Sequence, residues 1–213
     1  MTPEKYRFIV VEGPIGVGKT TLAKLFAEHF HSRLLLEDAA ANPFLAKFYH
    51  DPERYALPTQ LFFLFQRAEQ MRELAQSDLF HHATVTDFLL DKDPLFARLN
   101  LSDDEFKLYR EMYLHLQPQT PKPDLVIYLQ APVEALMERI VQRSIGYEQT
   151  ITQGYLSRLT DSYSQYFHHY DASPLLIVNS ENFNFTGQTQ DFDLLLEKIA
   201  GMRGGREFFN RAG

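Results

Sequence analysis

Short apolar runs alternate along the chain with longer stretches in which apolar residues recur at helical spacing. After the first run, Leu22, Leu25, Phe26 and Phe30 fall on one face of a helix. Nearly continuous apolar strands that alternate with helices indicate a parallel sheet covered on both faces. We therefore predict a three-layer α/β fold in which helices flank a five-stranded parallel sheet. The strands are expected at residues 7–12, 33–36, 83–88, 125–129 and 175–178.

Composition narrows the classes of partner. The 213 residues are 45% hydrophobic, so we expect a single domain over residues 1–213, with a frayed tail at about 201–213. The formal net charge of −7 disfavours a nucleic acid polymer or an anionic membrane as partner. No apolar run approaches the roughly 20 residues that cross a bilayer, and the absence of cysteine fits a reducing compartment. A cytoplasmic protein is the expectation.

The glycine-rich stretch GPIGVGKTT joins the first predicted strand to the first predicted helix. Gly13, Gly18, Lys19 and Thr20 satisfy GxxxxGK[ST] in the strand-to-helix context that this motif requires. In such a loop the backbone N–H groups and the helix N-terminus surround the phosphates, while the lysine reaches the β and γ oxygens and the hydroxyl binds Mg²⁺. The motif does not identify the acceptor. We predict that ATP contacts Gly13, Pro14, Ile15, Gly16, Val17, Gly18, Lys19, Thr20 and Thr21.

Two carboxylates lie where predicted strands end, at the sheet edge where ligands gather in open α/β folds. Asp87 lies near the carboxyl end of the third strand and, with Thr20, is a candidate Mg²⁺ ligand, directly or through water. Glu37 follows the second strand, where a carboxylate facing the γ-phosphate can take the proton of an attacking hydroxyl. Taken alone, each also fits an ordinary surface carboxylate. Because the chain lacks the NKxD of GTPases and its fourth strand ends without an acid, a kinase is favoured.

Cationic groups are expected in the segment ERIVQRSIGYEQ. Arg139 and Arg143 are four residues apart and so share one helix face, and a polar, glycine-containing lid is expected at about residues 143–152. Two arginines over the cleft would stabilise the charge of the transferring phosphoryl group and exclude water. The alternative is an exposed basic face that Glu134 and Glu138 balance.

Taken together, these residues resemble the deoxynucleoside kinase family of P-loop enzymes over about residues 8–170. The family's glycine loop matches GPIGVGKT, and its strand-end glutamate matches Glu37. Its substrate helix, with glutamine and arginine seven residues apart, matches Gln60 and Arg67 in TQLFFLFQRAEQM. The resemblance implies a P-loop kinase fold and ATP-dependent phosphorylation of the 5′-hydroxyl of a deoxynucleoside in nucleotide salvage, with Mg²⁺.

Further segments match bacterial members of the family. Their NP-aromatic and KFY segments correspond to residues 42–44 and 47–49, and PDLVIYLQAPVEALMERIVQR looks like their strand and lid helix. Asp38 stands where the family usually has a proline after the glutamate. This branch favours purine deoxynucleosides, and members of the family are usually homodimers, so both are expected here by resemblance.

The resemblance also assigns roles to single residues. Glu37 becomes the general base, beside Lys19, Arg139 and Arg143 as catalytic cations. Tyr49 and Glu148 would hold the 3′-hydroxyl of the deoxyribose, while Gln60 pairs with the base and Phe63 lines its pocket. The expected substrate contacts are Glu37, Tyr49, Gln60, Phe63, Arg67, Asp93 and Glu148.

The sequence departs from the family after its third strand. The family has an acid followed by Arg-Ser there, with a base-reading Asp six residues after the acid. DFLLDKD places Asp87 and Asp93 six apart but has Phe88 and Leu89 in place of Arg-Ser. We adopt this register because it preserves both carboxylates.

A second register remains open at the same segment. Anchored on the later pair at residues 96–97, it puts Thr86 at the acid and Lys92 at the Asp. In both registers the family's arginine is absent. The lid also departs, since Arg-x-Arg becomes Arg-Ser-Ile at residues 143–145.

Two other functions fit part of these observations. A nucleoside monophosphate kinase would share the fold and chemistry, but it needs additional cations for the phosphate of its acceptor, and the substrate helix offers only Arg67 and Arg72. A nucleotide-binding subunit or sensor with little turnover gains support from the absent arginine. Deoxynucleoside kinase is preferred because it explains the loop, the glutamate, the substrate helix and the lid together.

Overall fold

The computed structural model describes residues 6–76, 83–116, 121–183 and 189–210. Its strands form one parallel sheet in the order β2-β3-β1-β4-β5-β6. The predicted α/β fold is confirmed, and the five predicted strands are present with ends that differ by one or two residues. The strands are β1 Phe8–Glu12, β2 Arg33–Leu35, β3 Thr84–Thr86, β4 Leu125–Gln130, β5 Leu175–Asn179 and β6 Arg206–Phe209.

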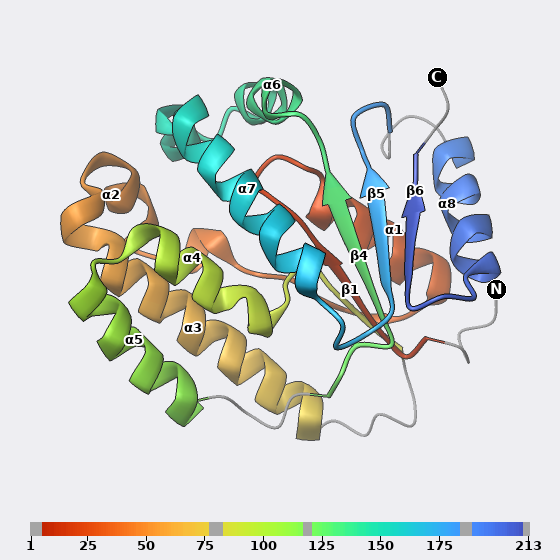
Figure 1. Cartoon of the computed structure of the whole chain (residues 1–213), viewed down its shortest axis with the longest axis horizontal. Helices are drawn as coiled ribbons and strands as arrows, with labels where there is room; N and C mark the ends of the chain where they lie inside the picture. The colour runs from red at the N-terminus through yellow and green to blue at the C-terminus, as the bar shows by residue number, and fades with distance from the viewer. Residues whose placement is uncertain (1–5, 77–82, 117–120, 184–188, 211–213) are drawn as a thin grey trace.

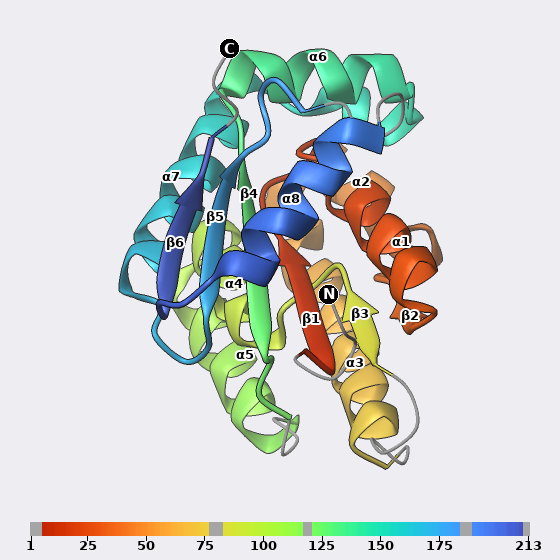
Figure 2. The same cartoon turned by 90° about the vertical axis from the view of Figure 1, so that its right-hand side faces the viewer.

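Helices cover both faces of the sheet (Figures 1 and 2). On one face α1 packs against α8, where the rings of Phe26 and Phe192 are 5.2 Å apart. On the other face α7 lies against β4, with the rings of Tyr128 and Phe167 4.2 Å apart. The helices are α1 Lys19–Phe30, α2 Leu45–His50, α3 Pro52–Gln76, α4 Asp93–Asn100, α5 Asp103–Leu116, α6 Val133–Arg143, α7 Gln153–His169 and α8 Thr189–Gly201, with short 3-10 turns at Ala39–Ala41 (η1), Leu90–Lys92 (η2) and Gly146–Thr150 (η3).

Burial on both faces explains the continuous apolar runs of the central strands. All five residues of β1 are buried, and so are the first five of β4. A parallel sheet between two helical layers has no solvent-facing side, so polar and apolar residues do not alternate there. Glu12, the last residue of β1, is a charged residue in this otherwise apolar strand, and its exposed fraction is 0%.

The sheet has six strands rather than the five predicted, because part of the tail is ordered. Arg206–Phe209 forms β6, which pairs with β5 as an edge strand. The guanidinium of Arg206 donates to the carbonyls of His168 and Tyr170 at 2.8 and 2.6 Å. The prediction of a frayed tail is wrong for these residues. Their alternating, half-buried pattern is too short and too close to glycines to indicate a strand from the sequence.

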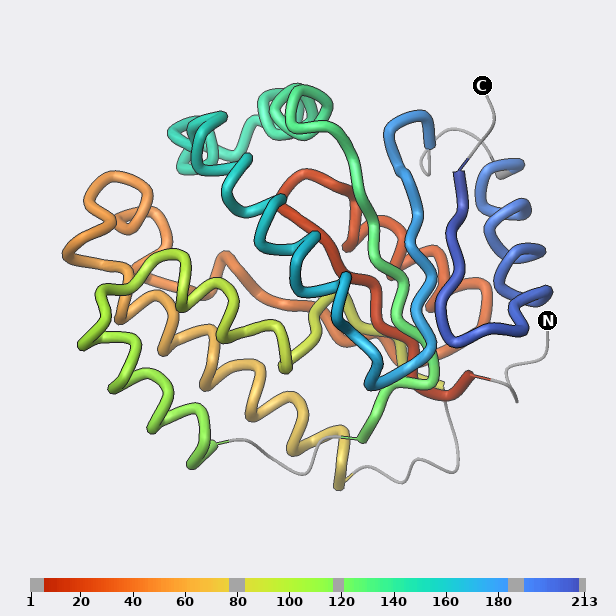
Figure 3. The backbone as a smooth tube through the Cα atoms, viewed as in Figure 1, coloured from red at the N-terminus to blue at the C-terminus, as the bar shows by residue number. Residues whose placement is uncertain are grey.

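The topology brings three loops together at the carboxyl edge of the sheet. Strands β2, β3 and β1 are neighbours, so the residues that follow them converge. Figure 3 shows α6 above the loop that follows β1, and in that loop Gly16 lies against Leu136 and Ile140 of α6. Among the residues that the structure describes, no helix has the length and apolar content needed to cross a membrane.

Candidate active site

The loop after β1 approaches its neighbours so closely that only glycine fits at two positions. Gly13 has φ +152°, and a Cβ there would lie 2.5 Å from the carbonyl oxygen of Leu129 in β4. Gly16 has φ +82°, and its Cβ would lie 2.9 Å from the carbonyl oxygen of Leu136 in α6. L-residues rarely adopt such positive φ values. The phosphate loop is therefore fixed between the sheet and the lid helix.

Lys19, the first residue of α1, lies inside the curve of this loop. Its Nζ donates to the carbonyl oxygens of Gly13 and Pro14 at 2.7 and 3.1 Å. Burial lowers the pKa of Lys19 to about 8, against the opposing pull of the Glu12 carboxylate. The ammonium is thus held at the position where the predicted motif requires a phosphate-binding cation.

Asp87, directly after β3, joins the phosphate loop to the second strand end. Its Oδ2 accepts from the Thr20 hydroxyl at 2.6 Å, and its Oδ1 accepts from the backbone N–H of Glu37 at 2.9 Å. Burial raises the pKa of Asp87, while the hydroxyl and N–H donors oppose the change. Carboxylate and hydroxyl oxygens are the ligands that Mg²⁺ prefers. The donor set at the predicted metal position therefore fits that ion.

Glu37 faces a fixed cation from α3. Arg67 donates from its Nε to Glu37 Oε1 at 2.6 Å and pairs through Nη1 with Asp93. Asp93 also accepts from the Tyr109 hydroxyl at 2.7 Å. Burial raises the pKa of Glu37, but Arg67, Lys92 and Lys19 together outweigh it and hold that pKa below its usual value. The carboxylate is ionised at neutral pH, as a proton acceptor must be.

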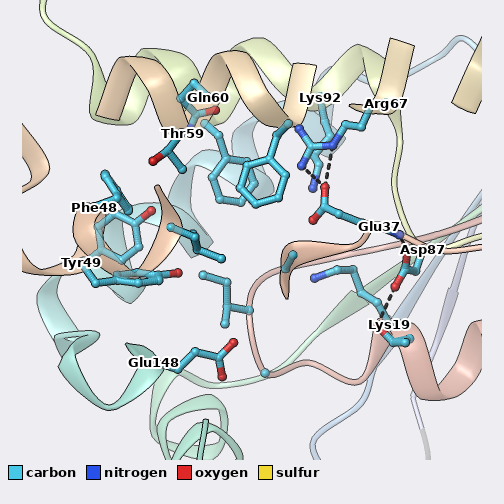
Figure 4. A pocket seen from close by; sticks show the side chains of 18 of the residues that line it. Lys19, Glu37, Phe48, Tyr49, Thr59, Gln60, Arg67, Asp87, Lys92 and Glu148 are labelled. Carbon is cyan, nitrogen blue, oxygen red and sulfur yellow. Dashed lines mark hydrogen bonds and ion pairs between the residues drawn. The ribbon is translucent and has the colours of Figure 1, made fainter. Parts of the chain in front are cut away.

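One cavity extends from the phosphate loop past Glu37 to α2 and α3 (Figure 4). Arg143, the last residue of α6, binds Glu148 of the lid through two nitrogens, at 3.0 and 2.6 Å. Tyr49 of α2 stacks on Tyr147 with ring centroids 6.0 Å apart and planes 9° apart. One end of the cavity is therefore closed by the Glu148 carboxylate of the lid and by the Tyr49 phenol of α2. The lining includes Ile15, Gly16, Lys19, Thr20, Glu37, Tyr49, Gln60, Phe63, Arg67, Asp87, Lys92, Arg143 and Glu148.

The far end of the cavity combines an amide with an aromatic face. Gln60 and Phe63 are buried on the same face of α3 and both line the cavity. The Oε1 atom of Gln60 has no hydrogen-bond partner among the described residues. A buried amide oxygen without a partner is unfavourable, and a ligand N–H at this position would satisfy it. The site fits a flat, polar-edged ring.

Two of the predicted charged site residues, Arg139 and Asp93, do not line the cavity. Five predicted residues of the phosphate-loop stretch are also outside its lining: Gly13, Pro14, Val17, Gly18 and Thr21. Arg139 turns from the lid and donates from Nη2 to the carbonyl oxygens of Ser180 and Glu181 at 2.7 and 3.0 Å. Asp93 has an exposed fraction of 0% and lies behind Arg67. Helix spacing put both arginines on one face of α6, but only Arg143 is at the helix end beside η3. Asp93 thus contacts the cavity only through the arginine that it binds.

Two charged residues at the site were missed as site residues. Lys92 lines the cavity, and its Nζ lies 3.0 Å from Oε1 of the buried Glu12. They are 80 positions apart, so no local spacing relates them. The only sequence signal was the unusual segment DFLLDKD, which contains Lys92. Asp87 lies at the phosphate loop and Asp93 lies behind Arg67. The adopted register expected Asp93 to contact the base, but the cavity is lined instead by Lys92, which the second register puts at that place.

Comparison with known proteins agrees with this geometry. A family model described as deoxynucleoside kinase matches residues 9–202. The deoxyguanosine kinase of Bacillus subtilis is 31% identical over 197 residues, covering 90% of this chain and 95% of its own. The deoxyadenosine kinase of Lactobacillus acidophilus is 30% identical over 191 residues, covering 83% and 87%. The solved structure of deoxyadenosine kinase from M. mycoides with bound dATP has a TM-score of 0.79 at 21% identity, and the match covers 92% of this chain and 100% of that one.

The chain belongs to the deoxynucleoside kinase family. It is a phosphotransferase that acts on a deoxynucleoside, with ATP as the phosphate donor. The predicted family and enzyme class are thereby confirmed.

Proposed function

We propose that the cavity transfers the γ-phosphoryl group of ATP to the 5′-hydroxyl of a purine deoxynucleoside, with Glu37 as general base. The observation that supports this most is a carboxylate held ionised in the same cavity as Lys19 and the phosphate loop. Glu37 takes the hydroxyl proton as the 5′-oxygen bonds to the γ-phosphorus. The bond from that phosphorus to the β–γ bridging oxygen breaks, and ADP leaves. Lys19 and Arg143 stabilise the charge that develops.

Mg²⁺ would be held by Thr20 and Asp87. Their oxygens are in contact at the mouth of the phosphate loop, 2.6 Å apart. The ion supplies charge neutralisation on the phosphate oxygens when it is bound. Asp87 also accepts from the backbone N–H of Glu37. The same residue would therefore hold the ion and position the general base.

The rest of the cavity orients the deoxynucleoside. Tyr49 and Glu148 would bind the 3′-hydroxyl, which fixes the sugar with its 5′-carbon toward Glu37. Gln60 would hydrogen-bond the edge of the base while Phe63 contacts its face. The amide offers both a donor and an acceptor, as an adenine edge requires. The names of the relatives, a deoxyguanosine kinase and a deoxyadenosine kinase, support a purine.

A monophosphate acceptor fits this cavity less well. Among the described lining residues, each guanidinium is already bound to a carboxylate, Arg67 to Glu37 and Asp93 and Arg143 to Glu148. A second phosphate at the acceptor end would have to break one of these pairs. Deoxynucleoside phosphorylation in nucleotide salvage is therefore the proposed activity. Because this activity uses ATP, we propose the cytoplasm as the location of the protein.

The test measures ADP release with ATP and Mg²⁺ against each of the four deoxynucleosides, their monophosphates and no acceptor. We expect turnover with deoxyadenosine or deoxyguanosine, and only background with the monophosphates. Release that requires a monophosphate would overturn the assignment of the acceptor. Omitting Mg²⁺ should reduce the rate to background.

We propose a homodimer that associates through α3 and α5. Phe65 of α3 and Leu108 of α5 have exposed fractions of 46% and 52%. Phe65 borders an apolar hollow with Met112, which is four residues from Leu108 and so lies on the same face of α5. Large apolar side chains that gather on one surface mark association sites. Sedimentation analysis should give twice the chain mass for the wild type and a lower mass for Leu108→Asp. An equal mass for both would exclude this surface.

A further inference from the structure

A buried cation lies on the acceptor side of the cavity with no role in the steps above. Lys92 ends η2, immediately before α4, and has an exposed fraction of 3%. It lines the same cavity as Glu37, and Figure 4 shows it beside Arg67, on the side where the Glu37 carboxylate lies. Lysine is almost never fully buried unless it is paired. Its position therefore needs an explanation.

Glu12 anchors this lysine. Lys92 Nζ donates to Glu12 Oε1 at 3.0 Å and to the Tyr163 hydroxyl at 2.9 Å. Glu12 also accepts from the backbone N–H groups of Gly13 and Leu89 at 3.0 and 2.9 Å, and from the Tyr163 hydroxyl at 3.0 Å. An ammonium has three donors, and these bonds account for two of them. The carboxylate that precedes the phosphate loop thus fixes a cation at the acceptor wall.

The neighbouring segment brings no other cation to this wall. Phe88, directly after Asp87, has an exposed fraction of 1% and borders a separate apolar hollow with Phe8 and Met71. In DFLLDKD the only basic residue is Lys92. Arg67 lies nearby, but its guanidinium already binds Glu37 and Asp93.

We propose that Lys92 is a further catalytic residue of phosphoryl transfer, whose ammonium binds the 5′-oxygen of the acceptor. This inference rests on the proposed function of the site. As the 5′-oxygen gives its proton to Glu37, negative charge develops on that oxygen. A cation fixed there beforehand stabilises that charge without reorganisation. Glu12 provides the fixation.

The split between kcat and KM distinguishes this role from a structural ion pair. The charge on the acceptor oxygen develops only in the transition state, so loss of a cation that stabilises it lowers kcat more than it raises the KM of the deoxynucleoside. A cation that serves only the fold would leave the kcat of a folded variant unchanged.

The experiment compares three variants with the wild type. Lys92→Met removes the cation but leaves Glu12 as an unpaired buried charge. The double variant Glu12→Gln/Lys92→Met removes both charges and so keeps the interior neutral. Tyr163→Phe removes a hydroxyl from the same network and leaves every charge in place. Thermal unfolding and MgATP affinity show that each variant is folded and binds the donor.

We expect the double variant to lose about 100-fold in kcat with the deoxynucleoside, the effect typical of one preorganised charge-stabilising group. The KM of the deoxynucleoside should change much less than kcat, and Tyr163→Phe should keep a kcat close to that of the wild type. A folded double variant with the kcat of the wild type would overturn the role of Lys92. The proposed function is tested separately, by the turnover of the wild type with and without the deoxynucleoside. The role of Lys92 is tested by the ratio of the kcat of the variant to the kcat of the wild type.

Discussion

The two ends of the cavity are built in different ways. The donor end is a continuous stretch of nine residues, the loop after β1 and the start of α1, with contacts so close that Gly13 and Gly16 admit no side chain. The acceptor end is assembled from side chains of α2, α3, η2 and the lid, which ion pairs hold in place. A contiguous sequence motif can therefore specify the donor end, whereas the acceptor end forms only when the folded chain brings distant residues together. Substitutions at the acceptor end should therefore alter the acceptor kinetics and leave donor binding intact.

The largest effect is expected for Glu37→Gln. The amide keeps a hydrogen bond to Arg67 but cannot take the hydroxyl proton, so kcat should fall by about 1000-fold. MgATP affinity should stay close to that of the wild type, because the donor end is untouched. Steady-state kinetics and calorimetric titration of MgATP measure the two quantities. Undiminished kcat would remove Glu37 from the role of base.

A smaller effect is expected for Glu148→Gln, which breaks the ion pair with Arg143. The KM of the deoxynucleoside should rise about tenfold through loss of a charged hydrogen bond to the sugar. Glu138→Gln, at an exposed position of α6, is the matched control and should behave as the wild type. An equal rise in the KM of ATP and the KM of the deoxynucleoside would contradict the assignment of Glu148 to the acceptor end.

Proton uptake tests the donor end. With a pKa of about 8, Lys19 is partly deprotonated near that pH, and bound phosphates raise its pKa. Binding of MgATP at pH 8 should take up about half a proton, and almost none at pH 6. Calorimetry in buffers of different ionisation enthalpy measures this uptake. Lys19→Met should abolish it; equal heats in both buffers at pH 8 would contradict the lowered pKa.

The smallest effect on activity is expected in β6, remote from both ends. Phe209 packs on Phe183 with ring centroids 5.5 Å apart, whereas Phe208 has an exposed fraction of 65%. Phe209→Ala should lower the free energy of unfolding by about 1–2 kcal/mol and leave kcat unchanged. Phe208→Ala should change stability by less than about 0.5 kcal/mol. Equal effects in a denaturant titration would argue against a packed β6.

The difference between the two ends also decides what the sequence could predict. The phosphate loop, the strands β1 to β5 and the strand-end acids follow from local pattern, because each is contiguous or sits at an element boundary. The salt bridge of Lys92 with Glu12 joins residues 80 apart, and no periodicity relates them. Arg139 shares a helix face with Arg143, yet its guanidinium binds the carbonyls after β5. Their contacts depend on tertiary packing, which spacing on one helix does not determine.

The most direct test of the acceptor assignment follows the phosphate itself. ATP labelled at the γ-phosphate is incubated with Mg²⁺, the protein and deoxyadenosine or deoxyguanosine, and the products are separated. With Glu37 activating a sugar hydroxyl, the label should appear in a deoxynucleoside 5′-monophosphate, and a 5′-deoxy analogue of the same nucleoside should receive none. Label found only in inorganic phosphate, or transferred to the 5′-deoxy analogue, would contradict phosphorylation of the 5′-hydroxyl.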